Sequence, residues 1–230
     1  MNVVITGAGK GIGFETTLKL LSDKHNVIAL SRNIESLKKI ERKTKLLTSI
    51  SFDLAKDDYK SLFEKITSRF KKVDVLINNA GTLVNKPFEY ITETDLYNVY
   101  NVNIFSVFKL TQYLLPLMKG GSKKKSHIVN ISSMGGMQGA VKFSGLSAYS
   151  SAKGALTVLT ECLALELKNK NVAVNCLCLG AVQTEMLSEA FPDYKASVTA
   201  KQMAGFISEF AVSSSDFFNG KILPVSLSTP

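Results

Sequence analysis

A tyrosine and a lysine lie four residues apart in the segment Tyr149-Ser150-Ser151-Ala152-Lys153. In a helix this spacing places both side chains on one face, one turn apart. A nearby ammonium favours the phenolate and lowers the pKa of a tyrosine from its usual value of ~10. Such a phenol can act as a general acid or base. Because this pair also arises by chance on helices, its chemistry depends on the groups around it.

Two serines, Ser132 and Ser133, follow the apolar run 127–131. A hydroxyl at the carboxyl end of a strand can donate a hydrogen bond to a substrate oxygen. The alternative role for both serines is to stabilise the turn that ends the strand.

A glycine-rich turn, Thr6-Gly7-Ala8-Gly9-Lys10-Gly11-Ile12-Gly13, lies between the apolar run 2–6 and a segment with helical periodicity. Glycines permit a tight turn and close approach of the backbone to a pyrophosphate. The following helix presents free N–H groups and the positive end of its dipole. This context predicts a phosphate- or dinucleotide-binding site.

The second apolar run ends in Ser31 and Arg32, where NAD-binding sites carry an acidic residue that accepts hydrogen bonds from the ribose hydroxyls. Arg32 and Lys10 could instead reach a 2′-phosphate, which a carboxylate would repel. The sequence therefore favours NADP(H). The alternative is that both cations only add to a basic surface.

Two further strand ends carry polar residues. Asp53 follows the third run and would lie near the adenine, although Asp53 or Asp57 could equally cap the next helix. The fourth run leads into Asn78-Asn79-Ala80-Gly81, which alone is an ordinary Asn/Gly turn.

Strand-like and helix-like segments alternate along the chain. Helical periodicity is found at 11–24, 34–43, 56–70, 92–118, 149–169 and 199–213, and apolar runs rich in Val and Ile at 2–6, 26–30, 46–52, 73–77, 127–131, 172–179 and 221–227. This alternation predicts an α/β fold with a doubly wound parallel sheet covered by helices on both faces. No linker or repeat interrupts the 230 residues, so we expect a single domain.

The composition is 45% hydrophobic and 20% charged, as in a globular protein. The net charge of +9 raises the question of nucleic acid, but the lysine clusters lack interleaved aromatic residues, so we expect solvated surfaces. Cys162, Cys176 and Cys178 are expected to be buried free thiols in a reducing compartment. We expect no membrane span and no signal peptide, and hence a cytoplasmic protein.

Taken together, these motifs resemble the short-chain dehydrogenase/reductase family over nearly the whole chain. They are the glycine turn, the Asn-Asn-Ala-Gly segment, Asn103, Ser133, and Tyr149 with Lys153, and they occur in the family's order. The resemblance implies a Rossmann fold with a seven-stranded parallel sheet and hydride transfer with NAD(P)(H).

The resemblance also implies roles. Tyr149 would be the general acid, Ser133 would hold the carbonyl oxygen, and Lys153 would lower the pKa of Tyr149 and bind the nicotinamide ribose. Asn103 would hold a water behind Lys153, and Thr184 would contact the carboxamide. The implied nucleotide contacts are Gly7, Gly9, Lys10, Gly11, Ile12, Gly13, Ser31, Arg32, Asp53, Leu54, Asn79, Ala80, Gly81, Tyr149, Lys153, Gly180, Val182 and Thr184. No metal is implied.

The sequence departs from the family's pattern in places. Ser133 and Tyr149 are 16 residues apart, more than is common, so Ser132, Ser144 and Ser147 are alternatives for the serine role. The substrate loop, about 181–200, is short, which suggests an open site or a bulky or carrier-borne substrate.

We therefore expect an NADPH-dependent reductase of a small-molecule or acyl-carrier-borne carbonyl. A 3-oxoacyl-[acyl-carrier-protein] reductase and a sepiapterin-reductase-like enzyme are alternatives, as is a nucleotide-sensing protein without turnover. Acyl carrier protein is acidic, and a basic landing site could come from Lys119, Lys123, Lys124, Lys125, Lys168 and Lys170.

The resemblance also implies a homodimer or homotetramer formed through the helices near 92–118 and 149–169. The apolar positions that could serve that interface could equally be core: Leu110, Leu114, Leu156, Leu159 and Leu163.

Overall fold

Seven parallel strands form one sheet in the order β3-β2-β1-β4-β5-β6-β9, in a computed structural model that describes residues 1–120 and 124–227. The strands are β1 (Asn2–Thr6), β2 (Asn26–Ser31), β3 (Leu47–Ser51), β4 (Val75–Asn78), β5 (Ser126–Ser133), β6 (Val172–Leu179) and β9 (Ile222–Val225). Adjacent strands all pair in parallel. The predicted seven-stranded Rossmann fold is confirmed.

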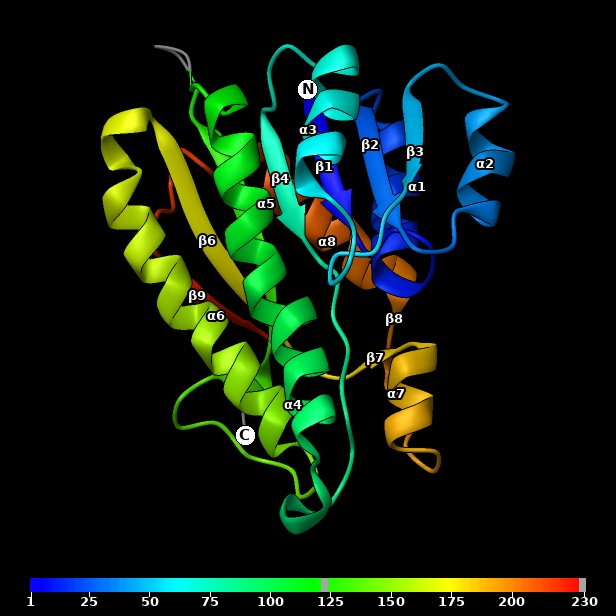
Figure 1. Ribbon diagram of the computed structural model, residues 1–230, viewed down its shortest axis with the longest axis vertical. Helices are drawn as coiled ribbons and strands as arrows, with labels where there is room; N and C mark the ends of the chain where they lie inside the picture. The colour runs from blue at the N-terminus through cyan, green and yellow to red at the C-terminus, as the bar shows by residue number, and fades with distance from the viewer. Residues whose placement is uncertain (121–123, 228–230) are drawn as a thin grey trace.

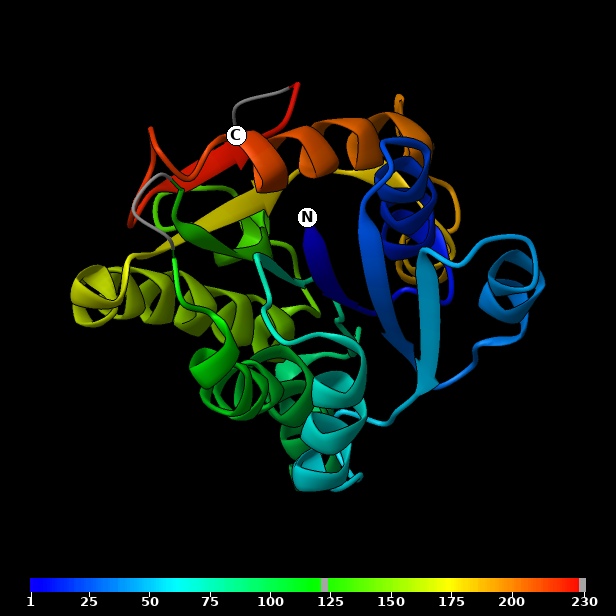
Figure 2. The ribbon, with the colours of Figure 1, turned by 90° about the horizontal axis from the view of Figure 1, so that it is seen from above.

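Helices cover both faces of this sheet (Figures 1 and 2). On one face lie α1 (Gly11–Ser22) and α8 (Ala200–Ser213), and on the other lie α3 (Tyr59–Arg69), α4 (Glu93–Tyr100), α5 (Ser106–Leu114) and α6 (Ser147–Glu166). The short α2 (Glu35–Glu41) lies beside the β3 edge. Single 3₁₀ turns occur at Phe88–Tyr90, Leu115–Leu117, Met134–Gly136 and Lys168–Lys170.

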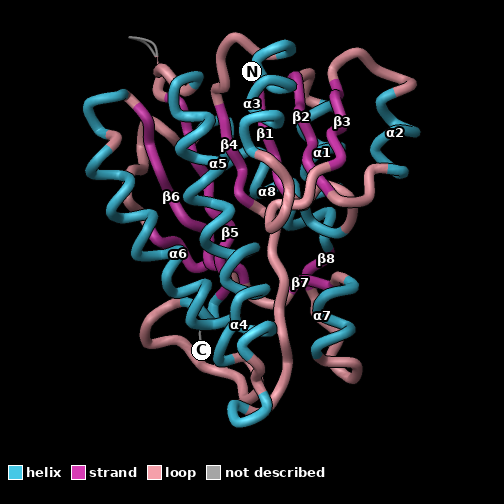
Figure 3. The backbone as a smooth tube through the Cα atoms, in the orientation of Figure 1, coloured by secondary structure: helices cyan, strands magenta, loops and turns pink. Residues whose placement is uncertain are grey.

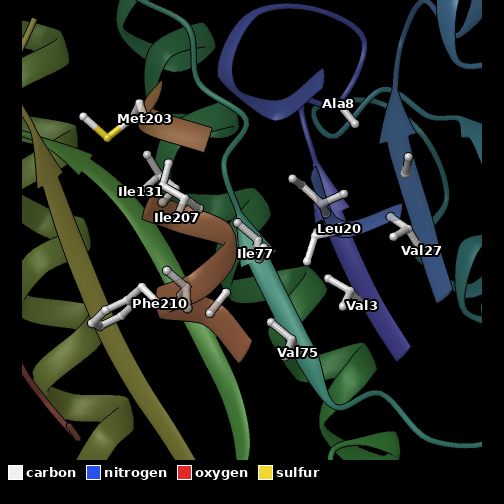
Figure 4. Packing of buried hydrophobic residues seen from close by; sticks show 14 of the residues in the cluster. Val3, Ala8, Leu20, Val27, Val75, Ile77, Ile131, Met203, Ile207 and Phe210 are labelled. Atoms are coloured by element: carbon white, nitrogen blue, oxygen red, sulfur yellow. The ribbon is translucent and has the colours of Figure 1, made fainter. Parts of the chain in front are cut away.

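The hydrophobic core has one layer on each face of the sheet. The central strands carry apolar side chains on both faces, because helices cover both faces of a parallel sheet. Figure 4 shows the α8 side, where Ile207 and Phe210 pack with Ile77 and Ile131 of the sheet in one buried cluster. A second cluster lies under α3, α5 and α6. Burial on both faces holds the strand ends rigidly, which is what a site built on them needs.

The predicted single helix over 92–118 is interrupted. The chain forms α4, then a π-helical turn at Asn101–Phe105, then α5. The leucines considered for an interface belong to the core instead, since Leu110, Leu114, Leu156 and Leu159 are buried within one chain and Leu163 is half-buried.

The carboxyl ends of all seven strands lie at one edge of the sheet, where the longest loops gather (Figure 3). The order of strands reverses between β1 and β4, and ligands bind at this kind of reversal in doubly wound sheets. The predicted loop 181–200 holds a helix, α7 (Glu185–Ala190), between two short paired strands, β7 (Val182–Gln183) and β8 (Val198–Thr199).

The opposite edge carries the lysines that were candidates for a carrier-protein landing site. Lys124 and Lys125 precede β5, and Lys168 and Lys170 precede β6, so they lie at the amino ends of these strands; Lys123 lies outside the described residues. The prediction of buried thiols is confirmed for Cys176 and Cys178 but is wrong for Cys162, which is exposed on α6.

Candidate active site

A cavity of about 860 Å³ opens at the carboxyl edge of the sheet. It is lined by the glycine turn, by the ends of β2 to β6, by the start of α6 and by α7. Every residue predicted to contact nucleotide lines it, as do Ser133, Tyr149 and Lys153; Asn103 alone of the predicted site residues lies just behind the wall. The sequence motifs therefore converge on one place.

The glycine turn brings α1 against the end of β1. Gly7 and Gly11 have φ of +67° and +58°, a region that favours glycine. A Cβ on Gly13 would lie 2.3 Å from the Gly7 carbonyl oxygen, and one on Gly9 would lie 2.4 Å from Ser31 Oγ. Side chains at these positions would therefore push the helix away from the strand.

The first turn of α1 has no side-chain cap within the described chain. The helices α2, α5 and α6 likewise begin without such a cap, whereas α3, α4, α7 and α8 each begin with a side chain that accepts hydrogen bonds from first-turn N–H groups. Uncapped N–H groups at the end of a 12-residue helix fit an anionic group such as a pyrophosphate.

Asn79 fastens the end of β4 to the glycine turn. Its Nδ2 donates to the carbonyl oxygens of Thr6, at 3.0 Å, and Gly7, at 3.3 Å. Thr6 Oγ1 in turn accepts from the N–H groups of Asn79 and Ala80. The Asn-Asn-Ala-Gly segment thus holds the two halves of the sheet together at the reversal point.

Arg32 and Lys10 flank the same end of the cavity, but they differ in their partners. Lys10 forms an exposed ion pair with Glu185 of α7, across the cavity mouth, and this hydrogen bond raises the pKa of Lys10. No carboxylate of the described residues pairs with Arg32. The sequence prediction treated both cations as free, and Glu185 was not foreseen.

The residues after β3 show that one alternative from the sequence, a helix cap at Asp53 or Asp57, is wrong. Asp53 and Leu54 line the cavity, as predicted for the adenine end. The helix cap is neither Asp53 nor Asp57 but Asp58, whose carboxylate accepts from Lys60 and Ser61 N–H groups. Asp53 Oδ1 accepts instead from Ala55 N–H, because the chain makes a tight turn before α3.

Ser133 and Tyr149 are neighbours in the cavity wall, and the Ser133 hydroxyl acts to lower the pKa of the Tyr149 phenol. Ser133 Oγ accepts from the Gly135 N–H at 3.2 Å, which leaves its own proton free to donate. Of the alternative serines, Ser132 donates to the Lys153 carbonyl at 2.9 Å, and Ser144 and Ser147 do not line the cavity. The geometry therefore favours Ser133.

Lys153 lies one turn after Tyr149 on α6, as the spacing predicts. Its side chain is 3% exposed, and its Nζ donates to the Ile131 carbonyl at 2.8 Å. Burial lowers the pKa of Lys153 to about 8. The lysine is thus protonated at neutral pH and loses its charge under mildly alkaline conditions.

The expected lowering of the Tyr149 pKa is not found. Burial raises the pKa of Tyr149 to about 12, and the neighbouring Ser133 hydroxyl opposes this only in part. Lys153 Nζ lies 5.8 Å from the phenol ring centroid and is directed at a backbone carbonyl, so it does not offset the desolvation. At neutral pH the phenol is protonated and suited to donate its proton.

Asn103 is fully buried in the π-helical turn. Its Nδ2 donates to Thr82 O and Val99 O, at 2.7 and 2.8 Å. A Cβ on Gly81 would lie 3.1 Å from Asn103 Oδ1 and 3.4 Å from Lys153 Nζ, so both side chains border Gly81. The turn, which the periodicity did not reveal, is a feature often found at functional sites.

Gly180, Val182 and Thr184 were predicted to contact the cofactor, Thr184 at the nicotinamide carboxamide, and all three line the cavity. Thr184 also caps α7, since its Oγ1 accepts from Leu187 N–H at 3.3 Å. A Cβ on Gly180 would lie 2.4 Å from Ser226 Oγ, so the backbone is tightly held here.

The sequence did not identify the individual residues of the outer wall. They come from the loop 134–148 and from α7 and its C-terminal end: Met134, Val141, Phe143, Leu146, Met186, Leu187, Ala190, Phe191 and Tyr194. These segments are tied to the loop after β4, because Asn85 Nδ2 donates to Ala190 O at 2.9 Å and Lys86 N–H donates to Gly145 O at 3.0 Å. Neither segment has a periodic pattern that could have signalled this.

A comparison with known families decides where the protein belongs. The family model described as short chain dehydrogenase matches residues 1–195. The chain belongs to the short-chain dehydrogenase family. Its fold is thus that of a family of oxidoreductases.

Among curated short-chain dehydrogenases, the chain is 32% identical over 202 residues to the 3-oxoacyl-[acyl-carrier-protein] reductase of Thermotoga maritima, covering 86% of this chain and 79% of that protein. It is 34% identical over 186 residues to carbonyl reductase [NADPH] 2 of Sus scrofa, covering 81% and 73%. These relatives have different substrates, so similarity alone does not select one.

A solved structure, a 4-hydroxyisoleucine dehydrogenase mutant complexed with NADH and succinate, superimposes with a TM-score of 0.88. The two sequences are 25% identical, and the alignment covers 98% of this chain and 97% of the other.

Residues 1–120 and 124–227 contain no helix long and apolar enough to cross a bilayer. They also contain no cluster of three or more histidine, cysteine, aspartate or glutamate side chains that could hold a metal ion.

Proposed function

We propose that this short-chain dehydrogenase is an NADPH-dependent carbonyl reductase. The observation that carries the proposal is the convergence of Ser133 and Tyr149 in the cavity wall, with Lys153 buried one turn further along α6. A nucleotide-sensing protein without turnover would have no use for a phenol positioned to donate a proton.

A bound NADPH supplies the hydride in this chemistry. Ser133 and Tyr149 donate hydrogen bonds to the substrate carbonyl oxygen, on which negative charge grows as the carbonyl carbon is reduced. Donors that are already aimed at developing charge are a major source of rate enhancement. Tyr149 then gives its proton to the oxygen, and its pKa of about 12 keeps the phenol protonated in the free site, as this role requires.

Proton return to Tyr149 is assigned to Lys153 and to a water held by Asn103. The position of both side chains beside Gly81 supports this assignment. The lysine ammonium also holds the nicotinamide ribose, as the family resemblance implies. Lys153 and Asn103 thus supply the proton and Lys153 orients the cofactor, whereas Tyr149 contacts the substrate itself.

The choice of NADPH rests on the end of β2. Arg32 is exposed and free of a carboxylate partner at the position where an acidic residue would select NADH. A guanidinium there is suited to bind a 2′-phosphate through two parallel hydrogen bonds. Lys10 can join it only after leaving Glu185. The similarity to carbonyl reductase [NADPH] 2 agrees with this choice.

A carrier-borne substrate is less well supported than a small molecule. The lysines considered as a landing site lie at the amino ends of β5 and β6, whereas the cavity lies at the carboxyl ends. A docked acidic carrier would therefore sit across the sheet from Tyr149.

We also propose that the enzyme works as a homodimer in the cytoplasm. The outer surface of α4, α5 and α6 exposes large apolar side chains, which supports an interface there: Leu96, Tyr97, Phe108, Val158 and Leu165. The free thiols of the described chain suit a reducing compartment.

The deciding experiment is Tyr149→Phe, measured by NADPH oxidation over a panel of ketones. We expect kcat to fall about 1,000-fold, since general acid catalysis contributes 10²–10⁴-fold. The dissociation constant for NADPH, followed by nucleotide fluorescence, should stay within about twofold. Tyr113→Phe, a change on α5 away from the cavity, is the matched control. Substantial residual activity in Tyr149→Phe would overturn the proposal.

A further inference from the structure

The cavity has two chemically different parts. The glycine turn and the ends of β2, β3 and β4 form the part assigned to the nucleotide. Beyond Ser133 and Tyr149, the wall consists of the loop 134–148 and α7 with the residues that follow it. A substrate whose carbonyl oxygen reaches Ser133 and Tyr149 must extend along this outer wall.

The outer wall is apolar and partly aromatic. Phe143 comes from the loop 134–148, and Phe191 follows α7, yet their ring centroids lie 5.8 Å apart at 63°. Val141, Phe143 and Tyr194 are each about half exposed, at 51%, 50% and 53%. This apolar surface borders the cavity and is available to cover a ligand.

Most of the charged side chains that line the cavity lie in the other part. The described charged residues that line the cavity are Lys10, Arg32, Asp53, Lys56, Lys153 and Glu185. All but Lys153 and Glu185 lie at the nucleotide end, and Glu185 is held there by Lys10. Lys142, on the loop 134–148, does not line the cavity, and its Nζ donates to the carbonyl oxygens of Met137 and Ala140.

We infer that the substrate is a neutral ketone bearing an aryl or similarly bulky apolar group, and that carboxylates, phosphates and polyhydroxy ketones are excluded. The inference rests on the proposed reductase function. An aromatic substituent can pack edge-to-face against Phe143 and Phe191. An anion in the same place would lose its hydration without gaining a cation.

Three matched substrates test this with NADPH and the whole enzyme. Methyl benzoylformate has a ring and no charge, benzoylformate has the same ring and a carboxylate, and methyl pyruvate has neither ring nor charge. We expect kcat/KM for methyl benzoylformate to exceed that for methyl pyruvate about 10–100-fold, the gain from burying a phenyl-sized group. Benzoylformate and a ketopentose should fall at least about 100-fold below it.

Two variants locate the preference in the wall. Phe191→Ala and the milder Phe191→Leu should each lower kcat/KM for methyl benzoylformate, by about tenfold and threefold, while that for methyl pyruvate stays within about twofold. Phe217→Ala, at a residue that is 82% exposed and outside the cavity lining, should change neither value. The folded state of each variant is checked by its NADPH dissociation constant.

The outcomes separate the two proposals. If methyl pyruvate is reduced but the ring gives no advantage, or if benzoylformate is preferred, the substrate inference is wrong and the reductase function stands. The same holds if Phe191→Leu slows both esters equally. If no carbonyl compound is reduced although NADPH binds, the reductase function fails and the substrate inference with it.

Discussion

Two sets of polar groups lie at opposite ends of the central strands. One is buried on β5 and β6 toward their amino ends, and the other belongs to α1 and α6 beside the carboxyl ends. Toward the amino end, His127 Nδ1 donates to Ala211 O at 3.0 Å, and Asn175 Nδ2 donates to His127 Nε2 at 2.9 Å. Asn175 Oδ1 accepts from Lys221 N–H at 3.0 Å. At the carboxyl end, Ser150 Oγ is buried without a partner, and the first turn of α1 has no side-chain cap.

This difference distinguishes polar groups that stabilise the fold from polar groups that are available to bind a ligand. Buried groups that satisfy one another stabilise the fold and have nothing left to offer a ligand. Donors and acceptors that the chain leaves open are costly unless something else binds them. Buried hydroxyls without a partner also occur outside the cavity, at Thr111 and Ser208, so such a group indicates a ligand site only where it borders the cavity, as Ser150 does. The paired histidine does not border it, although histidine is the commoner catalytic residue.

The largest expected effect is on stability and tests the satisfied group. Burial lowers the pKa of His127 to about 4. The histidine of the unfolded chain has a pKa near 6.5. Between pH 4 and pH 6.5 the unfolded chain therefore binds a proton at this histidine that the folded chain does not bind. The free energy of unfolding should therefore fall by about 3 kcal/mol as pH drops from 6.5 to 4.

His127→Gln should remove this fall, as measured by urea unfolding at several pH values, and should leave the NADPH dissociation constant unchanged at pH 7.5. His25→Gln, at the half-buried histidine of the described chain, is the control and should keep most of the slope. A loss of NADPH binding in folded His127→Gln would break the comparison.

The second effect concerns the close contact under the glycine turn. Gly13→Ala places a Cβ 2.3 Å from Gly7 O and 2.4 Å from Asn79 Nδ2, so α1 must shift and carry its open N–H groups with it. Overpacking of this kind costs about 2 kcal/mol, so the NADPH dissociation constant should rise about 30-fold.

Gly205→Ala on α8 is the matched control, since a Cβ there would meet no atom within 4 Å. That variant should bind NADPH normally and gain about 0.5–1 kcal/mol in helix stability. Equal NADPH binding by the two alanine variants would mean that α1 does not hold the nucleotide.

The third effect tests the unpaired guanidinium. Arg32→Ala should weaken NADPH binding about tenfold, through the loss of a charged hydrogen-bond donor, and leave NADH binding unchanged. Both dissociation constants are measured by nucleotide fluorescence at fixed ionic strength. Arg42→Ala, an exposed arginine after α2 that does not line the cavity, controls for the net charge. A wild type that prefers NADH would refute the argument.

The smallest effect concerns the paired cation next to it. Glu185→Gln releases Lys10 for the 2′-phosphate, so NADPH binding should become about two- to threefold tighter, as befits an exposed ion pair. The gain should vanish in 1 M salt, where the screening length is about 3 Å. Glu209→Gln on α8, outside the cavity, should show no such gain. Tighter binding of NADH in Glu185→Gln would point to a different cause.

The fold could be predicted from the sequence because each strand is an apolar run, and because each run is followed by glycine or polar residues. Glycine and amide positions at the ends of β1 and β4 depend on local backbone geometry, which short motifs encode. The π-helical turn at Asn101–Phe105 was missed because it adds only one residue to a helical period. The pKa of Tyr149 was misjudged because burial is a property of the whole fold.

The outer wall could not be predicted residue by residue. Phe143 and Phe191 meet only after the loop 134–148 and α7 have been placed by separate strands. Likewise the Lys10–Glu185 pair joins residues 175 positions apart. Contacts of this kind depend on loop conformation, for which the chain has no periodic signal.

The ties of Asn85 and Lys86 to the two outer segments have a consequence for changing what the enzyme accepts. A Cβ on Gly145 would lie 2.1 Å from Asn85 Oδ1, so even a small insertion in the loop 134–148 disturbs the segment that anchors the end of α7. Grafting that loop alone from another short-chain dehydrogenase would therefore disrupt its contacts with both neighbouring segments. Altered selectivity is best sought by exchanging the three segments together.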